Sequence, residues 1–178
     1  MPVKSNPKSD AFKYSRHSPR GIDVTVAAII EREGRFLMVE ERSGSSLVLN
    51  QPAGHLEQGE SLLRAVVRET LEETAHHFEP SHVVGFYLWR SEEANTTYLR
   101  VAFCGEADPM ADVETLDEGI VAVHWLSRSQ LLSRQRQLRS PMVLRCLDDY
   151  LAGHRYPLDV IHYLDPRALF PFGQAAHA

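Results

Sequence analysis

The chain has 178 residues, of which 43% are hydrophobic and 24% charged, and its formal net charge is −5. This composition excludes collagen, coiled-coil and wholly disordered classes, and the length is typical of one globular domain. The longest uninterrupted apolar run, Val26 to Ile30, is far shorter than the ~20 residues of a spanning helix, and the N-terminus has no signal-peptide core. We therefore expect a cytoplasmic protein that does not bind membranes.

The charge balance and the cysteines narrow the function classes further. General nucleic-acid binding needs an excess of Lys and Arg, which this acidic chain lacks. Cys104 and Cys146 lie in apolar segments without C-x-x-C spacing, so we expect reduced core thiols and neither a disulfide nor a zinc site. Residues 1–20 carry five basic side chains against one acid, Asp10. We predict a flexible basic tail there, a single domain over residues 21–165, and a second tail over residues 166–178.

Strand-like segments dominate the beginning of this domain. Residues 23–31 and 35–41 flank Gly34 and predict a β-hairpin, and a third short strand is expected at residues 47–49. The Pro- and Gly-containing segment 51–60 is predicted to be a loop. Residues 61–75 contain neither Gly nor Pro and predict a helix with Ser61 as its N-cap.

The remaining segments complete a mixed pattern of strands and helices. Segments 82–90, 96–107 and 119–127 are strand-like, and an acidic loop is expected at residues 112–118. Residues 127–135 and 141–153 predict two helices, the second opened by Pro141 and closed by Gly153. Strands before, between and after helices predict an α/β (α+β) fold with helices packed on a mixed sheet.

The segment from Gly54 to Thr74 carries the candidate chemistry. On a helix, Glu69, Glu72 and Glu73 stand at positions i, i+3 and i+4, about 5–6 Å apart at Cβ. Carboxylates this close repel one another, and Mg²⁺ relieves the repulsion because it prefers oxygen ligands and is completed by substrate phosphates. For an isolated cluster the alternative is a solvated acidic face balanced by nearby arginines. The Gly-containing loop directly before the helix favours a metal site.

The spacing in this segment resembles the Nudix box of the Nudix hydrolases. The matching positions are Gly54, Glu60, Arg68, Glu69, Glu72 and Glu73. The pattern departs from the box at Thr70 and at His76, where aliphatic residues are usual, and at Ala75, where Gly usually follows the helix. Because alanine is disfavoured in the left-handed conformation that caps many helices, we expect this helix to run on past residue 75 or to end differently.

Further segments, residues 50–57, 138–141 and 155–158, resemble the bacterial phosphatase NudJ subgroup of that family. The family resemblance implies a Nudix-type α/β/α sandwich with a mixed, partly curled sheet and a catalytic loop-helix. It also implies hydrolysis of a nucleoside diphosphate linked to another moiety. The subgroup implies removal of terminal phosphates from nucleoside di- and triphosphates, and cleavage of thiamine pyrophosphate and hydroxymethylpyrimidine pyrophosphate.

The resemblance also implies roles for the box residues. It implies a Mg²⁺ site, with Mn²⁺ as an alternative ion, which lowers the pKa of a water that attacks phosphorus. Glu60 and Arg68 are expected to orient this machinery. The implied metal ligands are the side chains of Glu69, Glu72 and Glu73 and the carbonyl of Ala53, and a base role is the alternative for Glu72.

Residues outside the box complete the predicted site. The general base is expected just before residue 119, at Asp117 or Glu118, and an ordinary charged loop is an equal alternative. Arginine suits phosphate binding, and aromatic strand residues either stack on a base ring or belong to the core. On these grounds Arg42, Arg100, Tyr87 and Trp89 are candidate substrate residues, and so is His55, which lies beside the predicted metal loop. The resemblance of their segments to the NudJ subgroup implies a substrate wall formed by Arg139, Ser140, Arg155 and Tyr156. Each of these residues has a structural role as its alternative.

Two functions compete with a Mg²⁺-dependent hydrolase of small diphosphates. A non-catalytic, ligand-sensing Nudix module is expected to lose box carboxylates, and those of this chain are intact. An oxidised-nucleotide triphosphate pyrophosphohydrolase would prefer an oxidised purine triphosphate, and the subgroup-like segments argue against it. The expected partner is a small phosphorylated substrate and the expected state is a monomer, with a homodimer as the alternative.

Overall fold

The computed structural model describes residues 21–110 and 116–164. The predicted tails, residues 1–20 and 166–178, and the first part of the predicted acidic loop lie outside the described residues. Within the described ranges, no helix combines the length and the apolar character needed to cross a membrane.

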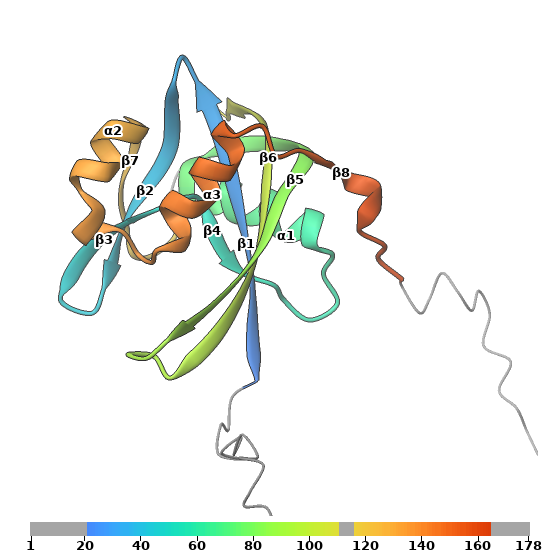
Figure 1. The fold of residues 1–178 in the computed structure, drawn as a ribbon, viewed down its shortest axis with the longest axis horizontal. Helices are drawn as coiled ribbons and strands as arrows, with labels where there is room; N and C mark the ends of the chain where they lie inside the picture. The colour runs from blue at the N-terminus through green and yellow to red at the C-terminus, as the bar shows by residue number, and fades with distance from the viewer. Residues whose placement is uncertain (1–20, 111–115, 165–178) are drawn as a thin grey trace, which may run out of the picture.

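A mixed sheet organises the described residues (Figure 1). Eight strands form it: β1 (Ile22–Arg32), β2 (Arg35–Ser43), β3 (Ser46–Asn50), β4 (Ala53–His55), β5 (His76–Ser91), β6 (Thr96–Pro109), β7 (Ile120–Ser127) and β8 (Tyr156–Pro157). The main order is β3-β2-β1-β6-β5-β8, while β4 pairs with β1 and β7 pairs with β2. Strands β1 and β6 run parallel, in contrast to the antiparallel hairpins β1–β2 and β5–β6. The predicted mixed sheet is confirmed.

The long first strand divides its length between two sets of neighbours. It pairs with β2 only through Glu31 and Arg32. Its earlier residues pair with β4 on one side and β6 on the other. The ladder between β1 and β2 is therefore short, and most of β1 lies between β4 and β6.

Helices pack on both faces of the sheet, as Figure 1 shows. Helix α1 (Leu62–Thr74) buries Ala65 and Val66 in a core cluster with Val26 and Phe103, whereas α3 (Met142–Leu151) and α2 (Arg128–Ser133) contribute to a second cluster around Ile29. Successive strand side chains point to opposite faces, so β1 supplies both clusters. The expected α/β/α sandwich is confirmed. Cys104 and Cys146 are buried and unpaired, as predicted.

Three predicted elements differ from those in the structure. The segment predicted as a loop contains the short strand β4, because its backbone completes the edge of β1. Strand β5 begins before Pro80, and its ladder to β6 shifts register between Pro80 and His82, since proline has no N–H to donate. The predicted helix 127–135 ends as α2 at Ser133 and is followed by a short 3₁₀ turn, η1 (Gln135–Gln137).

The ends of α1 show one confirmed prediction and one that is wrong. Ser61 caps the N-terminus, because its Oγ accepts the Arg64 N–H at 3.2 Å. At the other end the helix does not run on. It stops at Thr74, and Ala75 adopts the left-handed conformation with φ 56°. The Ala75 carbonyl accepts the Met110 N–H at 2.8 Å, so pairing with β6 turns the chain there despite the missing glycine.

Replacing Ala75 by Gly is expected to stabilise the protein by about 0.5–1 kcal/mol, because the left-handed conformation is strained for alanine and the gain exceeds glycine's larger unfolded-state entropy. Denaturant unfolding measures the difference. Ala152→Gly is a matched control, because Ala152 caps α3 with an ordinary φ of −72° and gains no such relief. An Ala75→Gly protein that is less stable than wild type would contradict the proposed strain.

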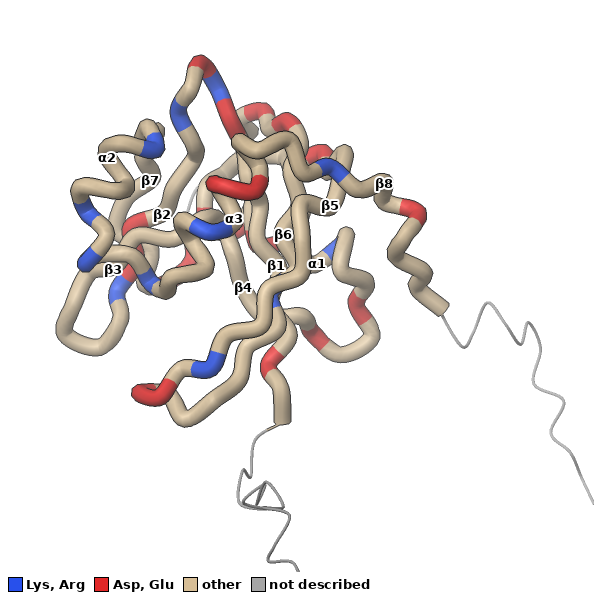
Figure 2. The backbone as a smooth tube through the Cα atoms, in the orientation of Figure 1, with Lys and Arg blue, Asp and Glu red and all other residues tan. Residues whose placement is uncertain are grey.

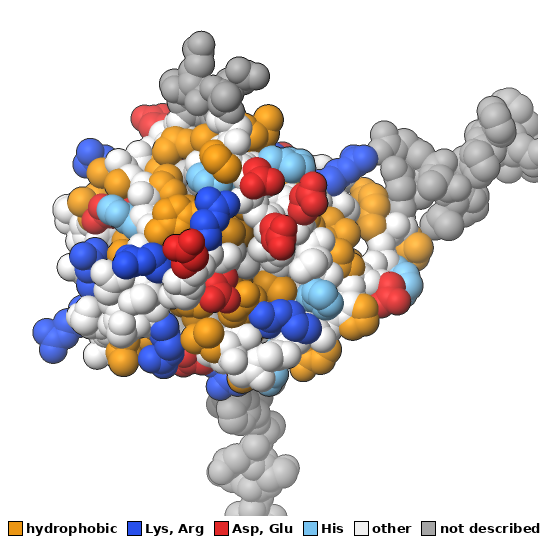
Figure 3. Space-filling view, turned by 90° about the horizontal axis from the view of Figure 1, so that it is seen from above, with side chains coloured by type: hydrophobic (Ala, Val, Ile, Leu, Met, Phe, Trp, Pro, Cys, Tyr) orange, Lys and Arg blue, Asp and Glu red, His pale blue; other side chains and the backbone are white. Residues whose placement is uncertain are grey.

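Charged side chains are spread over the molecule. Acidic residues occupy the tip of the β5–β6 hairpin, where Glu92 and Glu93 form the turn (Figure 2). On the face seen in Figure 3, acidic, basic and apolar side chains are intermixed. Charge alone therefore does not identify a functional surface on this face.

Candidate active site

A cavity of about 1040 Å³ brings together residues from β4, α1, β2, the β5–β6 hairpin and the segment before α3. Carboxylates and cations both line it. The lining residues include Glu41, Ala53, Gly54, His55, Glu57, Glu69, Glu73, Trp89, Glu93, Tyr98, Arg100, Arg136, Arg139 and Ser140. The cavity therefore contains both the candidate metal residues and several candidate substrate residues.

Two of the three helix carboxylates face this cavity. Glu69 and Glu73 are buried, with exposed fractions of 8% and 7%. Burial raises the pKa of both carboxyl groups above the ordinary range, and for Glu73 the pKa reaches about 8. The charges of Glu41 and Asp117 add to this effect at Glu73. Two buried carboxylates in one cavity have the electrostatic character of a cation site.

The Arg68 side chain forms hydrogen bonds both to the segment before α1 and to carboxylates of α1 itself. Its guanidinium forms a forked pair with Glu60, at 2.9 and 3.0 Å, and also donates to the His55 carbonyl at 3.0 Å. Its Nη1 donates to Glu69 at 2.8 Å and to Glu72 at 3.0 Å. The paired carboxylates raise the pKa of Arg68, while Arg68 lowers the pKa of Glu60. Arg68 thus connects the loop to the helix, and Glu72 points to Arg68 instead of lining the cavity.

Strand β4 approaches the carboxylates of helix α1 closely. The Ala53 N–H donates to Glu73 Oε2 at 2.8 Å. A Cβ atom added to Gly54 would overlap the Glu69 carboxylate, so only glycine leaves room for this side chain. The structure thus places Ala53 at the site through its N–H, and a ligand role for its carbonyl stays a prediction.

The residues present fit a divalent cation. Within residues 21–110 and 116–164, no three His, Cys, Asp or Glu side chains converge into a complete metal site. Mg²⁺ is nevertheless commonly held by one or two carboxylates, with waters and substrate phosphates completing its coordination. Glu69 and Glu73, which repel each other in a shared cavity, match that requirement.

The raised pKa of Glu73 leads to a test in the absence of metal. Between about 4.3, the ordinary glutamate value, and about 8, the folded protein binds more protons than the unfolded chain. The stability of the protein in EDTA should therefore fall as the pH rises through this window. Thermal unfolding across pH 5–8 measures the slope, and Glu73→Gln should flatten it. Parallel profiles for the two proteins would exclude Glu73 as the source.

Arg100 is buried beneath the cavity, with an exposed fraction of 4%. Its Nη1 donates to the Gln51 side chain at 3.1 Å and its Nη2 to the Asn50 side chain at 3.3 Å. Its Nε has no hydrogen-bond partner among the described residues. A buried guanidinium held by two neutral amides favours a nearby anion, because burial of an unmatched charge is unfavourable.

Aromatic and basic side chains form the outer part of the same cavity. The Trp89 and Tyr98 rings stack at 5.9 Å between centroids. Arg139 lies 3.7 Å from Glu41. Arg136, His55 and Ser140 also line the cavity. The cavity thus has a carboxylate end beside α1 and an outer region suited to phosphate and a flat ring.

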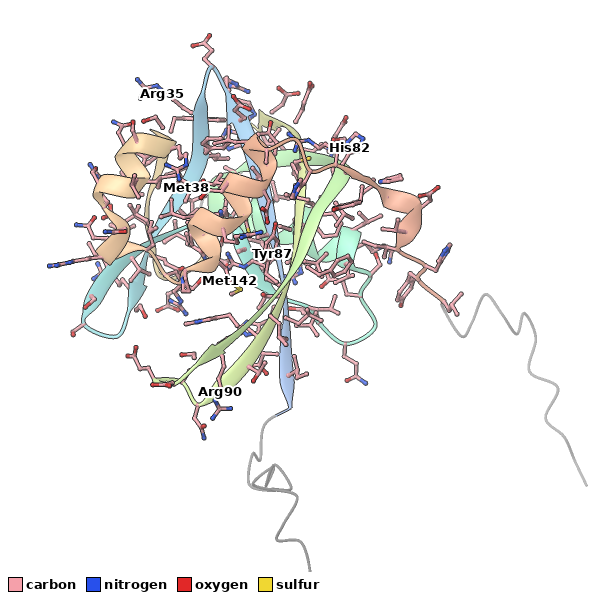
Figure 4. All side chains as sticks on the ribbon, viewed as in Figure 1. Arg35, Met38, His82, Tyr87, Arg90 and Met142 are labelled. Atoms are coloured by element: carbon pink, nitrogen blue, oxygen red, sulfur yellow. The ribbon has the colours of Figure 1, made fainter. Side chains whose placement is uncertain are left out.

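Several predicted substrate residues lie elsewhere. Arg42 is exposed and does not line the cavity, because it alternates with Glu41 on β2. Tyr156 lies on β8, where it pairs with Val83 of β5. Together with Tyr87 it borders a second cavity of about 750 Å³. Figure 4 shows Tyr87 beside α3, where its hydroxyl donates to Asp149 at 3.0 Å.

Three further residues predicted for the site, Arg155, Asp117 and Glu118, do not line the cavity. Arg155 lies over the Tyr150 ring at 3.7 Å, which favours its structural alternative. Glu118 is exposed and does not line the cavity. The Asp117 N–H donates to the Glu72 carbonyl at 2.9 Å, so Asp117 lies closer to the box helix than Glu118 does.

Sequence reasoning assigned no site role to several residues of the cavity region, among them Glu41, Asn50, Gln51 and Tyr98. Polar Asn50 and Gln51 directly after an apolar strand were a usable signal. Glu41 and Tyr98 gave none, since each lies in an ordinary strand pattern and reaches the cavity only through the fold.

Comparisons with known proteins identify the family of this chain. The sequence-family model of the NUDIX domain matches residues 19–146. Proteins named Phosphatase NudJ from Shigella boydii and from Escherichia coli K12 are each 38% identical over 138 residues, which cover 78% of this chain and 89% of the relative. A solved NUDIX hydrolase from Nitrosomonas europaea is 46% identical, with a TM-score of 0.79, covering 82% of this chain and 99% of that one.

The chain therefore belongs to the Nudix family and is a hydrolase acting on phosphoric anhydride bonds. Among curated proteins it is similar to the NudJ phosphatases. Nudix hydrolases act on small phosphorylated substrates and generally use divalent metal ions.

Proposed function

We propose that this chain is a Mg²⁺-dependent phosphatase of small diphosphates, acting in the cytoplasm as a monomer. Its substrates are nucleoside di- and triphosphates and pyrophosphates such as those of thiamine and hydroxymethylpyrimidine. The observation that carries the proposal is the pair of buried carboxylates, Glu69 and Glu73, in the cavity that also contains Arg100. The similarity to proteins named phosphatase supports orthophosphate as the released product.

The proposed metal residues are Glu69 and Glu73, with the Ala53 carbonyl as a further ligand. When bound, the metal neutralises phosphate oxygens and acidifies a water. The protein contributes positioning. Arg68 draws Glu69 and Glu72 toward itself, and the Ala53 N–H holds one oxygen of Glu73. Because these contacts exist before substrate binds, little reorganisation is needed during phosphoryl transfer.

The remaining cavity residues are proposed to bind the substrate. Arg100 supplies positive charge to a phosphate, held in place by its two amide partners. Arg139, which lies 3.7 Å from Glu41, is proposed as a further substrate contact. Trp89, stacked on Tyr98, offers a flat surface to an aromatic ring of the substrate. In this proposal the phosphates of the substrate lie between the carboxylates Glu69 and Glu73 and the aromatic pair Trp89 and Tyr98.

A substrate panel tests this function. The purified protein with Mg²⁺ is given nucleoside di- and triphosphates, thiamine pyrophosphate and hydroxymethylpyrimidine pyrophosphate, and orthophosphate is measured with and without added pyrophosphatase. Direct release of orthophosphate is expected. A signal that requires pyrophosphatase would indicate a triphosphate pyrophosphohydrolase instead. No turnover of any compound would favour a ligand-sensing module.

A further inference from the structure

The alternation of side chains along β2 directs one carboxylate into the cavity. The register of the neighbouring β2–β7 ladder shifts between Glu40 and Glu41, because β7 contributes one extra residue there. Glu40 contacts Nε2 of His124 on β7 at 3.1 Å. Glu41 instead lines the cavity that contains Glu69 and Glu73. Two consecutive glutamates therefore have different environments.

Polar neighbours hold the Glu41 carboxylate in position. Asn50 Nδ2 donates to its Oε1 at 3.3 Å, and Arg139 Nη1 lies 3.7 Å from its Oε2. The same Asn50 accepts a hydrogen bond from Arg100 through its Oδ1. The Glu41 side chain is only 19% exposed. A carboxylate offers about four acceptor positions, so these contacts orient it and leave capacity for a water in the cavity.

The other acidic residues near the cavity are less suited to accept a proton. Glu69 and Glu73 are the proposed metal ligands. Glu57 and Glu93 line the cavity but are exposed, on the β4–α1 loop and on the hairpin tip. Glu72 is bound by Arg68. Among the carboxylates that line the cavity in the described parts of the chain, Glu41 thus combines partial burial with a fixed orientation, and it is not one of the proposed metal ligands.

We propose that Glu41 is the general base of the hydrolysis, an inference that rests on the proposed function. The oxygen of the attacking water forms a bond to phosphorus while the anhydride P–O bond breaks. The bonding electron pair leaves with the departing oxygen. The proton of the water passes to the Glu41 carboxylate, which later releases it to solvent. Asn50 is then a positioning residue that orients Glu41 and Arg100 together.

The test compares Glu41→Gln with Glu40→Gln, the neighbouring glutamate outside the cavity. Glu41→Gln is expected to lower kcat on the best substrate of the panel by about 100- to 1,000-fold, the usual contribution of a general base. The KM and the Kd for Mn²⁺, measured by electron paramagnetic resonance, should stay within about threefold of wild type. Glu40→Gln should keep kcat within about threefold of wild type.

Two further measurements complete the test. Circular dichroism checks that both variants fold. Glu41→Asp, which keeps a carboxylate, should recover part of the lost kcat.

Each other outcome overturns the inference in a recognisable way. Wild-type kcat in Glu41→Gln shows that the base lies elsewhere. A parallel loss of Mn²⁺ affinity makes Glu41 a metal ligand, and a rise in KM alone makes it a substrate contact. If the wild-type protein turns over no compound of the panel, the proposed function fails and this inference fails with it. If wild type is active and Glu41→Gln equals it, only this inference fails.

Discussion

Replacing Glu73 by Gln is expected to reduce kcat by at least about 100-fold, because the metal supplies several kcal/mol of charge stabilisation in the transition state. The substitution keeps the size of the side chain and removes one of two buried charges that face the cavity. Affinity for Mn²⁺ should fall together with kcat. Orthophosphate release and electron paramagnetic resonance titration of Mn²⁺ measure the two effects.

The control for this variant is Glu79→Gln, which removes the same charge from an exposed position on β5. It should leave both kcat and Mn²⁺ affinity unchanged. The metal-free Glu73→Gln protein should also be at least as stable as wild type at pH 8, because it lacks the buried charge. A fully active Glu73→Gln enzyme would refute the assignment of Glu73 as a metal ligand.

Replacing Gly54 by Ala is the second substitution with a large expected effect. The added Cβ would overlap the Glu69 carboxylate, so this side chain has to move away from the cavity. Misplacement of a catalytic group by about 1 Å can cost about 100-fold in rate, and we expect a loss of that size in kcat/KM. Because the displaced atoms are the end of a flexible side chain, the melting temperature should change little.

Gly21→Ala provides the comparison for Gly54→Ala. A Cβ atom at Gly21 meets nothing within 4 Å, so activity and melting temperature should both be unchanged. Normal activity in Gly54→Ala would mean that the position of Glu69 in this structure is not needed for catalysis. A large fall in melting temperature would mean that the overlap is relieved by the backbone instead of by Glu69.

Local patterns were sufficient for most of the elements. The α1 helix and its Ser61 cap follow from a stretch without Gly or Pro and from the chemistry of a short polar side chain. The pairing of Arg68 with Glu60 also follows from spacing along the helix and loop. The end of the helix did not follow, because the β6 pairing at Ala75 imposes a conformation that alanine itself disfavours.

Local patterns predicted the residues that line the cavity less well. Arg42 and Glu41 are neighbours in sequence, and the alternation of side chains along β2 determines that Glu41 lines the cavity while Arg42 does not. Tyr156 was grouped with Arg139, yet β8 carries it to a different cavity. Exposure of a strand side chain depends on its partners, which lie far away in the chain.

The amino-acid sequence by itself therefore determined the family-like box, the mixed fold and the helix carboxylates, because these depend on residue type and short-range spacing. The three-dimensional packing decided which carboxylates are buried, which arginine lies beneath the cavity and which glutamate of β2 faces it. Those properties arise from contacts such as Glu41 with Asn50 and Arg100 with Gln51. They join residues whose side chains have no local reason to meet.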